Sequence, residues 1–205
     1  MKGILRRLMG GERGYSLIEL LVTMIILVIV LGSLTAVFVS GSSAEATLNR
    51  RFQAQQNARM ALDRIRGDVH CATAAQAQTI NTYPGVKFAV ASCYAGAPTT
   101  VSWCAVLVTA APARYALYRT TTTGATACAS NDASRVLIAD YLTSSSAFTT
   151  VTIPQYTLQR VGVDFKVSVN PTTATADVYE LTDSIAARNA TRCVTGGGCA
   201  VPSVP

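Results

Sequence analysis

The chain has 205 residues, of which half are hydrophobic and only 14% are charged, with a formal net charge of +6. The basic residues before position 15, less one acid, supply three of these charges, so the remainder is near +3. A charge this small gives little support to nucleic-acid binding, and a single histidine without a phosphate-binding glycine motif after a strand argues against an enzyme.

Residues 1–14 form a short leader that ends at Gly14, and a long apolar segment follows it. Leu20 to Val39 carries no charge, and its 20 residues would span about 30 Å as a helix, enough to cross a membrane. Glu19 stands at the head of this segment. A carboxylate costs roughly 2.5 to 3.5 kcal/mol at mid-bilayer, although less near the interface. Glu19 is therefore a candidate functional residue that needs a partner.

Cleavage after Gly14 would create that partner. The new α-amine of Tyr15 would have a pKa of about 7.7 to 8 and would be largely protonated at neutral pH. Tyr15 and Glu19 are four residues apart, which places them on one face of a helix. Unit charges about 4 Å apart attract by about 4 kcal/mol at an effective dielectric near 20. Pairing within a chain, or between staggered chains, could therefore decide whether helices associate.

The run Gly14-Tyr15-Ser16-Leu17-Ile18-Glu19, continued by Leu20-Leu21-Val22, resembles the prepilin cleavage and methylation motif of type IV pilins and type II secretion pseudopilins. Phe and Thr usually follow the cut, where this chain has Tyr15 and Ser16. The resemblance implies that a prepilin peptidase cuts between Gly14 and Tyr15 and that Tyr15 is N-methylated. It also implies that Glu19 is the assembly carboxylate and that other pilin subunits bind through the N-terminal helix.

Two alternatives remain for this segment. An ordinary signal peptide would be cut near Ser42-Ser43-Ala44, but its apolar region would be unusually long and would not explain Glu19. A plain signal anchor would keep Met1, so the first residue of the exported protein distinguishes the readings. The positive-inside rule keeps the leader cytoplasmic and places residues after about Ser40 outside.

Glu45 to Val69 is expected to be an amphipathic helix that continues the membrane helix, loosened before it by Gly32, Gly41, Ser42 and Ser43. Its apolar stripe should pack on a sheet. Arginines on the other faces indicate either a solvated surface with weak ion pairs or contact with neighbouring subunits or lipid head groups. The stripe consists of Leu48, Phe52, Ala58, Leu62, Ile65 and Val69, and the arginines are Arg50, Arg51, Arg59, Arg64 and Arg66.

After Gly67, short β-branched and aromatic runs separated by turn residues predict strands. Asn170-Pro171 is a turn signal, which predicts a hairpin between the last two strands. Residues 120–134 are polar and are expected to form a surface loop, and the tail after Gly196 is rich in Gly and Pro. The expected strands are Val86–Ala91, Cys104–Thr109, Tyr115–Arg119, Val136–Ala139, Thr157–Val169 and Ala176–Leu181.

All six cysteines follow the apolar segment, which suggests disulfides in an exported domain. Cys193 and Cys199 flank a flexible Gly-rich loop and are the favoured pair. A Cys93–Cys104 pair across a hairpin is a weaker prediction and leaves Cys71 with Cys128. A zinc site is the alternative, but no CxxC spacing is present and the only histidine is His70 at the expected helix end, so we expect no metal and no cofactor.

The helix segment Arg51–Arg66, with Tyr115–Arg119 and Ser184–Asn189, is similar to J-type minor pseudopilins and W-type minor pilins. The resemblance implies an α+β fold in which a long N-terminal helix packs on a mainly antiparallel sheet. It divides the chain into a leader (1–14), a transmembrane assembly helix (15–40) and an extracytoplasmic head (41–205). The implied role is a low-abundance subunit near the tip of a filament.

The main hypothesis is therefore a structural subunit, anchored once in the cytoplasmic membrane and incorporated in a surface or periplasmic filament. The alternatives are a DNA-binding or adhesive tip subunit, whose DNA affinity would fall steeply with salt, and a membrane-tethered adhesin indifferent to Glu19. The sequence does not choose between a pilus, a secretion pseudopilus and a competence fibre.

Overall fold

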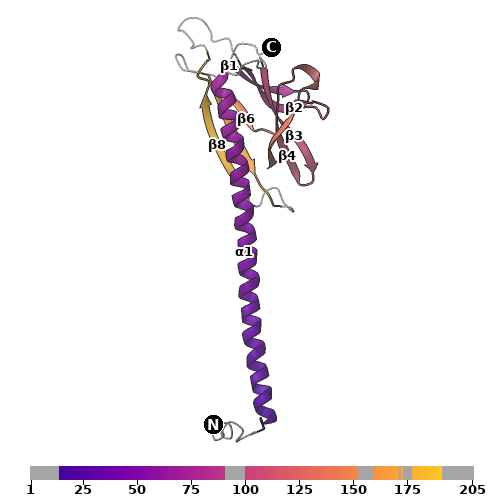
Figure 1. The fold of residues 1–205 in the computed structure, drawn as a ribbon, viewed down its shortest axis with the longest axis vertical. Coiled ribbons are helices and arrows are strands. Elements are labelled where there is room, and N and C mark those ends of the chain that lie inside the picture. The colour runs from indigo at the N-terminus through magenta and orange to yellow at the C-terminus, as the bar shows by residue number, and fades with distance from the viewer. Residues whose placement is uncertain (1–13, 91–99, 152–158, 171, 173–176, 191–205) are drawn as a thin grey trace, which may run out of the picture. The chain divides into compact units, whose positions relative to one another are not determined.

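The computed structural model describes residues 14–90, 100–151, 159–170, 172 and 177–190. The chain divides into two compact units, residues 1–46 and 47–205, which we describe separately. Among the described residues, one α-helix, α1 (Leu17–Cys71), runs through both, and eight strands and a short 3-10 helix, η1 (Gly124–Thr126), follow it in unit 2 (Figure 1). The fold class is α+β, as predicted.

Unit 1 consists of the first part of α1, and every described residue in it is exposed. The expected loosening near Gly32 and Gly41 is not seen, because the helix is uninterrupted there. The Ser33 hydroxyl donates to the carbonyl of Val30 at 2.8 Å, and the Ser43 hydroxyl donates to that of Ser40 at 2.9 Å. These local hydrogen bonds satisfy the hydroxyls within the helix, so the small polar residues do not interrupt it.

The later part of α1 belongs to unit 2, and the expected amphipathic helix is confirmed. The buried stripe differs from the predicted one at its beginning, since Leu48 and Phe52 are 66% and 58% exposed. At about 100° per residue they are rotated away from the buried face. Alanines begin that face instead, at Ala54, Ala58 and Ala61. The buried apolar residues are Ala54, Ala58, Ala61, Leu62, Ile65 and Val69.

The eight strands form one antiparallel sheet in the order β1-β2-β3-β4-β5-β7-β6, with β8 pairing with β7. All six predicted strands are present with shifted ends, and the hairpin of the last two is confirmed by pairing along all of β7 and β8. The bounds are β1 Ala72–Ile80, β2 Tyr83–Val90, β3 Thr100–Ala110, β4 Ala113–Thr120, β5 Val136–Leu142, β6 Phe148–Val151, β7 Arg160–Val167 and β8 Tyr179–Ala186.

Two strands were not predicted. β1 is composed mainly of Ala, Gln and Thr, starts directly after α1, and is recognised by its pairing with β2. β6 is only four residues long and pairs with the first half of β7. β1 lacks the β-branched or aromatic run on which strand prediction relies, so pairing with β2 decides its conformation. The residues of β6, Phe-Thr-Thr-Val, are all strand formers, but the strand is short and follows a serine-rich segment, so it was not predicted.

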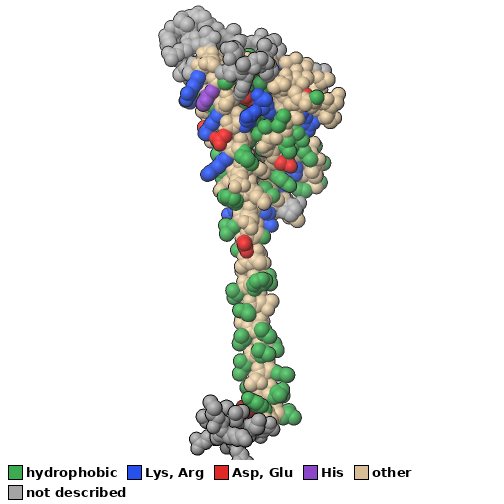
Figure 2. Space-filling model, viewed as in Figure 1, with side chains coloured by type: hydrophobic (Ala, Val, Ile, Leu, Met, Phe, Trp, Pro, Cys, Tyr) green, Lys and Arg blue, Asp and Glu red, His purple; other side chains and the backbone are tan. Residues whose placement is uncertain are grey.

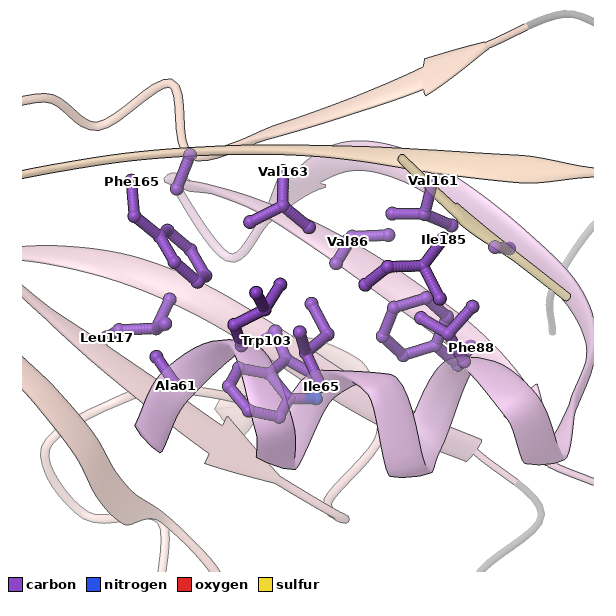
Figure 3. Close-up of a cluster of buried hydrophobic side chains, with 14 of the residues drawn as sticks. Ala61, Ile65, Val86, Phe88, Trp103, Leu117, Val161, Val163, Phe165 and Ile185 are labelled. Carbon is purple, nitrogen blue, oxygen red and sulfur yellow. The ribbon is translucent and has the colours of Figure 1, made fainter. Parts of the chain in front are cut away.

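The core of unit 2 lies between α1 and the concave face of the sheet (Figure 3). Trp103 is fully buried beside Ile65 of the helix, and an aromatic series continues through the sheet. The Phe148 ring meets Trp103 edge-on at 6.5 Å between centroids and meets Phe165 edge-on at 5.9 Å. Such edge-to-face pairs add to the stabilisation that burial alone supplies.

The side chain of Gln159 pairs with the backbone of β1 as a neighbouring strand would. The backbone N–H of Ala75 donates to Oε1 of Gln159 at 2.9 Å, and Nε2 of Gln159 donates to the carbonyl of Ala75. The backbone carbonyl of Gln159 also accepts a hydrogen bond from the Ala187 N–H at 2.8 Å. Gln159 thereby joins β1 to the end of β8 and satisfies buried backbone groups at this position.

Candidate functional site

The predicted assembly residues lie at the start of α1. Gly14, Tyr15 and Ser16 precede the helix, and the Tyr15 side chain is 80% exposed. Glu19 lies in the first helical turn. Among the described residues, no hydrogen bond or ion pair involves its carboxylate. In the uncleaved chain, Tyr15 is joined to Gly14 by a peptide bond, so the amine predicted to pair with Glu19 does not yet exist.

A second physical role for Glu19 follows from where the helix begins. Ser16 immediately precedes Leu17, and its carbonyl accepts hydrogen bonds from the N–H groups of Glu19 and Leu20 at 3.0 and 3.1 Å. Ser16 and Glu19 thus have the spacing of a capping box. A carboxylate in this turn is also favoured by the helix dipole, typically by about 0.3 to 1 kcal/mol. The Ser-x-x-Glu spacing is the sequence signal of this second role.

Beyond Glu19, α1 presents apolar side chains to its surroundings on every side. The helix contains a stretch long and apolar enough to cross a membrane. Its surface includes a shallow groove formed by residues spaced three and four apart, which gives an apolar face suited to lipid or to another helix. The groove is lined by Leu21, Met24, Ile25, Val28 and Ile29.

Some predicted disulfides are wrong. Cys104 is bonded to Cys128, so neither the Cys93–Cys104 pair nor the Cys71–Cys128 pair forms. Cys71 is disulfide-bonded as well. The bond closes over the face of the sheet opposite α1, where the loop after β4 folds back on β3. No pattern in the sequence indicates that this loop folds back on β3. Cys93, Cys193 and Cys199, and therefore the Cys193–Cys199 pair, lie outside the described residues.

The loop that carries Cys128 is organised around Asp132. The Asp132 carboxylate accepts hydrogen bonds from the hydroxyls of Thr120, Thr122 and Ser134 and from two backbone N–H groups. Burial of this carboxyl raises its pKa, but the hydrogen bonds from Thr120, Thr122 and Ser134 outweigh burial and lower the pKa from 3.8 to about 2. The loop therefore has a fixed conformation that depends on an ionised Asp132.

We expect this loop to make the head less stable in acid. Because the pKa of Asp132 is lower in the folded protein, its ionised form contributes about 2 kcal/mol above pH 3.8, and this contribution is lost as the pH falls towards about 2. The free energy of unfolding of the full chain in detergent, measured by urea titration from pH 5 to pH 2, should show this loss. Asp132→Asn should remove that part of the pH dependence, and an unchanged slope in this variant would contradict the assignment.

Lys and Arg side chains gather on the head part of the molecule (Figure 2), and three of the five arginines of α1 lie near acids of unit 2. Arg66 donates to Asp183 at 2.8 Å and lies 3.5 Å from Asp63. Asp177 lies 3.3 and 3.6 Å from Nε of Arg51 and Arg50, respectively. These contacts agree with the predicted surface of ion pairs. Arg59 and Arg64 have no ion pair or hydrogen bond among the described residues.

A buried carboxylate that the sequence did not single out ties α1 to the sheet. Asp68 is fully buried and accepts a hydrogen bond from Nε1 of Trp103 at 2.8 Å. The guanidinium of Arg119 donates to both of its oxygens, at 2.8 and 3.1 Å. This bidentate geometry is the strong form of an Arg–carboxylate contact. The role of Asp68 is structural, since both partners belong to the sheet of the same unit.

The described part of the chain contains no group of three histidines, cysteines, aspartates or glutamates placed to hold a metal ion. His70 lies in the last turn of α1, at the predicted helix end. The predictions of no metal, no cofactor and no catalysis stay predictions.

The family model described as "Prokaryotic N-terminal methylation motif" matches residues 9–35. No curated protein and no solved structure matches the chain. The matched range covers the end of the leader, Gly14, Tyr15, Glu19 and the first part of α1. It supports a relation to type IV pilins and pseudopilins and, with the apolar helix, membrane anchoring by a single span. The head lies outside the matched range.

Proposed function

We propose that this chain is a prepilin-type subunit that a prepilin peptidase cleaves after Gly14 and that then enters a type IV pilus-like filament. The observation that carries the proposal is the methylation motif at the start of a long helix that has Glu19 in its first turn and a wholly exposed apolar stretch after it. An exposed apolar helix of this length needs lipid or neighbouring helices around it. A subunit that moves from a membrane into a filament is surrounded first by lipid and then by neighbouring helices.

The proposed mechanism has two stages. In the membrane, the leader stays in the cytoplasm and the head lies outside, as the charge of the leader favours. Cleavage then gives Tyr15 a positive amine, which is methylated. As subunits pack through α1, Glu19 of one meets the amine of another, and the attraction offsets the cost of placing the carboxylate in an apolar filament core.

Within this class, we propose the role of a minor subunit that helps to start or cap the filament. The similarity of Arg51–Arg66 to J-type minor pseudopilins and W-type minor pilins supports this finer assignment. A DNA-binding tip is less favoured, because ion pairs with acids of the same unit already engage Arg50, Arg51, Arg66 and Arg119. Subunit stoichiometry in purified filaments, measured by quantitative mass spectrometry, tests the minor role.

Processing is tested by co-expressing the full chain with a prepilin peptidase. We expect N-terminal sequencing and intact-mass analysis to show Tyr15 as the first residue, carrying one methyl group. Gly14→Leu should abolish cleavage because a bulky side chain replaces glycine at the cut, whereas Gly11→Leu in the same leader should not. A product that begins at Glu45 or Met1 would refute the proposal in favour of a signal peptide or a plain anchor.

A further inference from the structure

The first two turns of α1 in unit 2, residues 47–53, contain no buried residue. Leu48 and Phe52 are exposed, and the first buried residue is Ala54. The helix farther on differs, since Ala61, Leu62 and Ile65 are all buried. Apolar burial therefore fixes the helix from Ala54 onward and contributes little before it.

A single carboxylate of the β7–β8 connection reaches these two turns. Oδ1 of Asp177 lies 3.3 Å from Nε of Arg51, and Oδ2 lies 3.6 Å from Nε of Arg50. Nδ2 of Asn170 donates a hydrogen bond to Oδ2 of Asp177 at 3.4 Å. Charge-assisted hydrogen bonds of good geometry are shorter, at about 2.7 to 2.9 Å. The contact is therefore loose, and the Arg51 side chain is 61% exposed.

The exposure of the three side chains indicates how strongly this contact holds the helix. The contact is not deeply buried on the helix side, although it is largely buried at Asp177. The side chains of Arg50 and Arg51 are 31% and 61% exposed, and that of Asp177 is 13% exposed. The φ of Asp177 is +54°, a left-handed conformation that aspartate adopts more readily than most residues. Ion pairs with exposed partners change an equilibrium by only roughly two- to five-fold, so the contact holds the helix weakly.

We propose that Asp177 is a releasable latch that holds residues 47–53 of α1 on the head while the helix from Ala54 onward stays packed. In the docked state, Asp177 occupies Arg50 and Arg51. In the released state, both arginines are available to a carboxylate of a neighbouring chain. Because the pair is partly exposed, salt screens it and favours release. This inference does not depend on the proposed function.

The latch is tested by measuring the distance from the helix to the sheet in the full chain in detergent micelles. Spin labels are attached to cysteines introduced at two exposed positions, Asn49 in the released part of the helix and Thr182 in the sheet. Pulsed electron paramagnetic resonance should show a docked distance at low salt. It should also show a longer distance whose population rises two- to five-fold in 1 M salt or in Asp177→Asn.

Asp183→Asn is the matched control, because Asp183 pairs with Arg66 where the helix is buried. This variant should leave the distance distribution unchanged. The swap Asp177→Arg with Arg50→Asp and Arg51→Asp should restore the docked distance, which separates lost charge from general misfolding. The proposal is overturned if Asp177→Asn and salt leave the distribution unchanged, if Asp183→Asn changes it equally, or if the swap does not restore it.

Discussion

Glu19→Ala should leave cleavage after Gly14 intact and reduce incorporation of the subunit into filaments by more than tenfold. The carboxylate is the one charge on the described helix before Glu45, and in an apolar filament core its interaction with a neighbour's amine would be worth several kcal/mol. Incorporation is measured by immunoblotting of sheared filaments against the membrane fraction, with N-terminal sequencing of both. Glu45→Ala, which removes another exposed acid of α1, is the matched control and should incorporate normally.

Glu19→Gln separates the two roles that the structure allows for this residue. Glutamine can take the place of glutamate in a capping box with Ser16, but it carries no charge. We expect Glu19→Gln to fail as Glu19→Ala does, because pairing with an amine requires the carboxylate. If Glu19→Gln incorporates at the wild-type level, Glu19 acts by starting the helix and the proposed pairing with a neighbour's Tyr15 is wrong.

Asp68→Ala should destabilise the head by about 3 to 5 kcal/mol. The change leaves the guanidinium of Arg119, whose side chain is 13% exposed, and the indole N–H of Trp103 without their buried acceptor. Removing one partner of a buried ion pair is costly because the other charge remains uncompensated. Chemical unfolding of the full chain in detergent, followed by Trp103 fluorescence, measures the loss.

The control for this prediction is Asp63→Ala on the same helix. The Asp63 side chain is 75% exposed and lies 3.5 Å from Arg66, so its removal should change the free energy of unfolding by no more than about 0.5 kcal/mol. If Asp68→Ala does not fold, Asp68→Asn gives a measurable variant that keeps the shape of the side chain. Equal stabilities of the Asp63 and Asp68 variants would contradict the structural role of Asp68.

Periodicity predicted the helix and the main strands because each repeats a chemical character at a fixed spacing. It failed at the beginning of the stripe. Leu48 and Phe52 are apolar, but at about 100° per residue they are rotated away from the face that Ala54, Ala58 and Ala61 bury, and they stay exposed. β1 lacks strand-forming side chains and takes its conformation from β2.

For the candidate site, too, the sequence indicates residues in a local motif but not contacts between residues that are distant in the chain. Gly14, Tyr15 and Glu19 could be predicted as site residues because their chemistry lies in a short local motif. Asp68 and the Cys104–Cys128 bond depend on residues that are 35, 51 and 24 positions apart in the chain. No local signal specifies which distant donor or thiol the fold will bring close. Such contacts become visible only after the sheet has curled around α1.

The amide of Gln159 also limits how two heads can associate. An exposed strand edge invites another chain to extend the sheet, which is a common route to aggregation. At Ala75 both backbone groups are already occupied from within the same head. Crowded subunits therefore cannot fuse into a shared sheet at this position, and lateral growth there is left to side chains, whose chemistry can discriminate one neighbour from another.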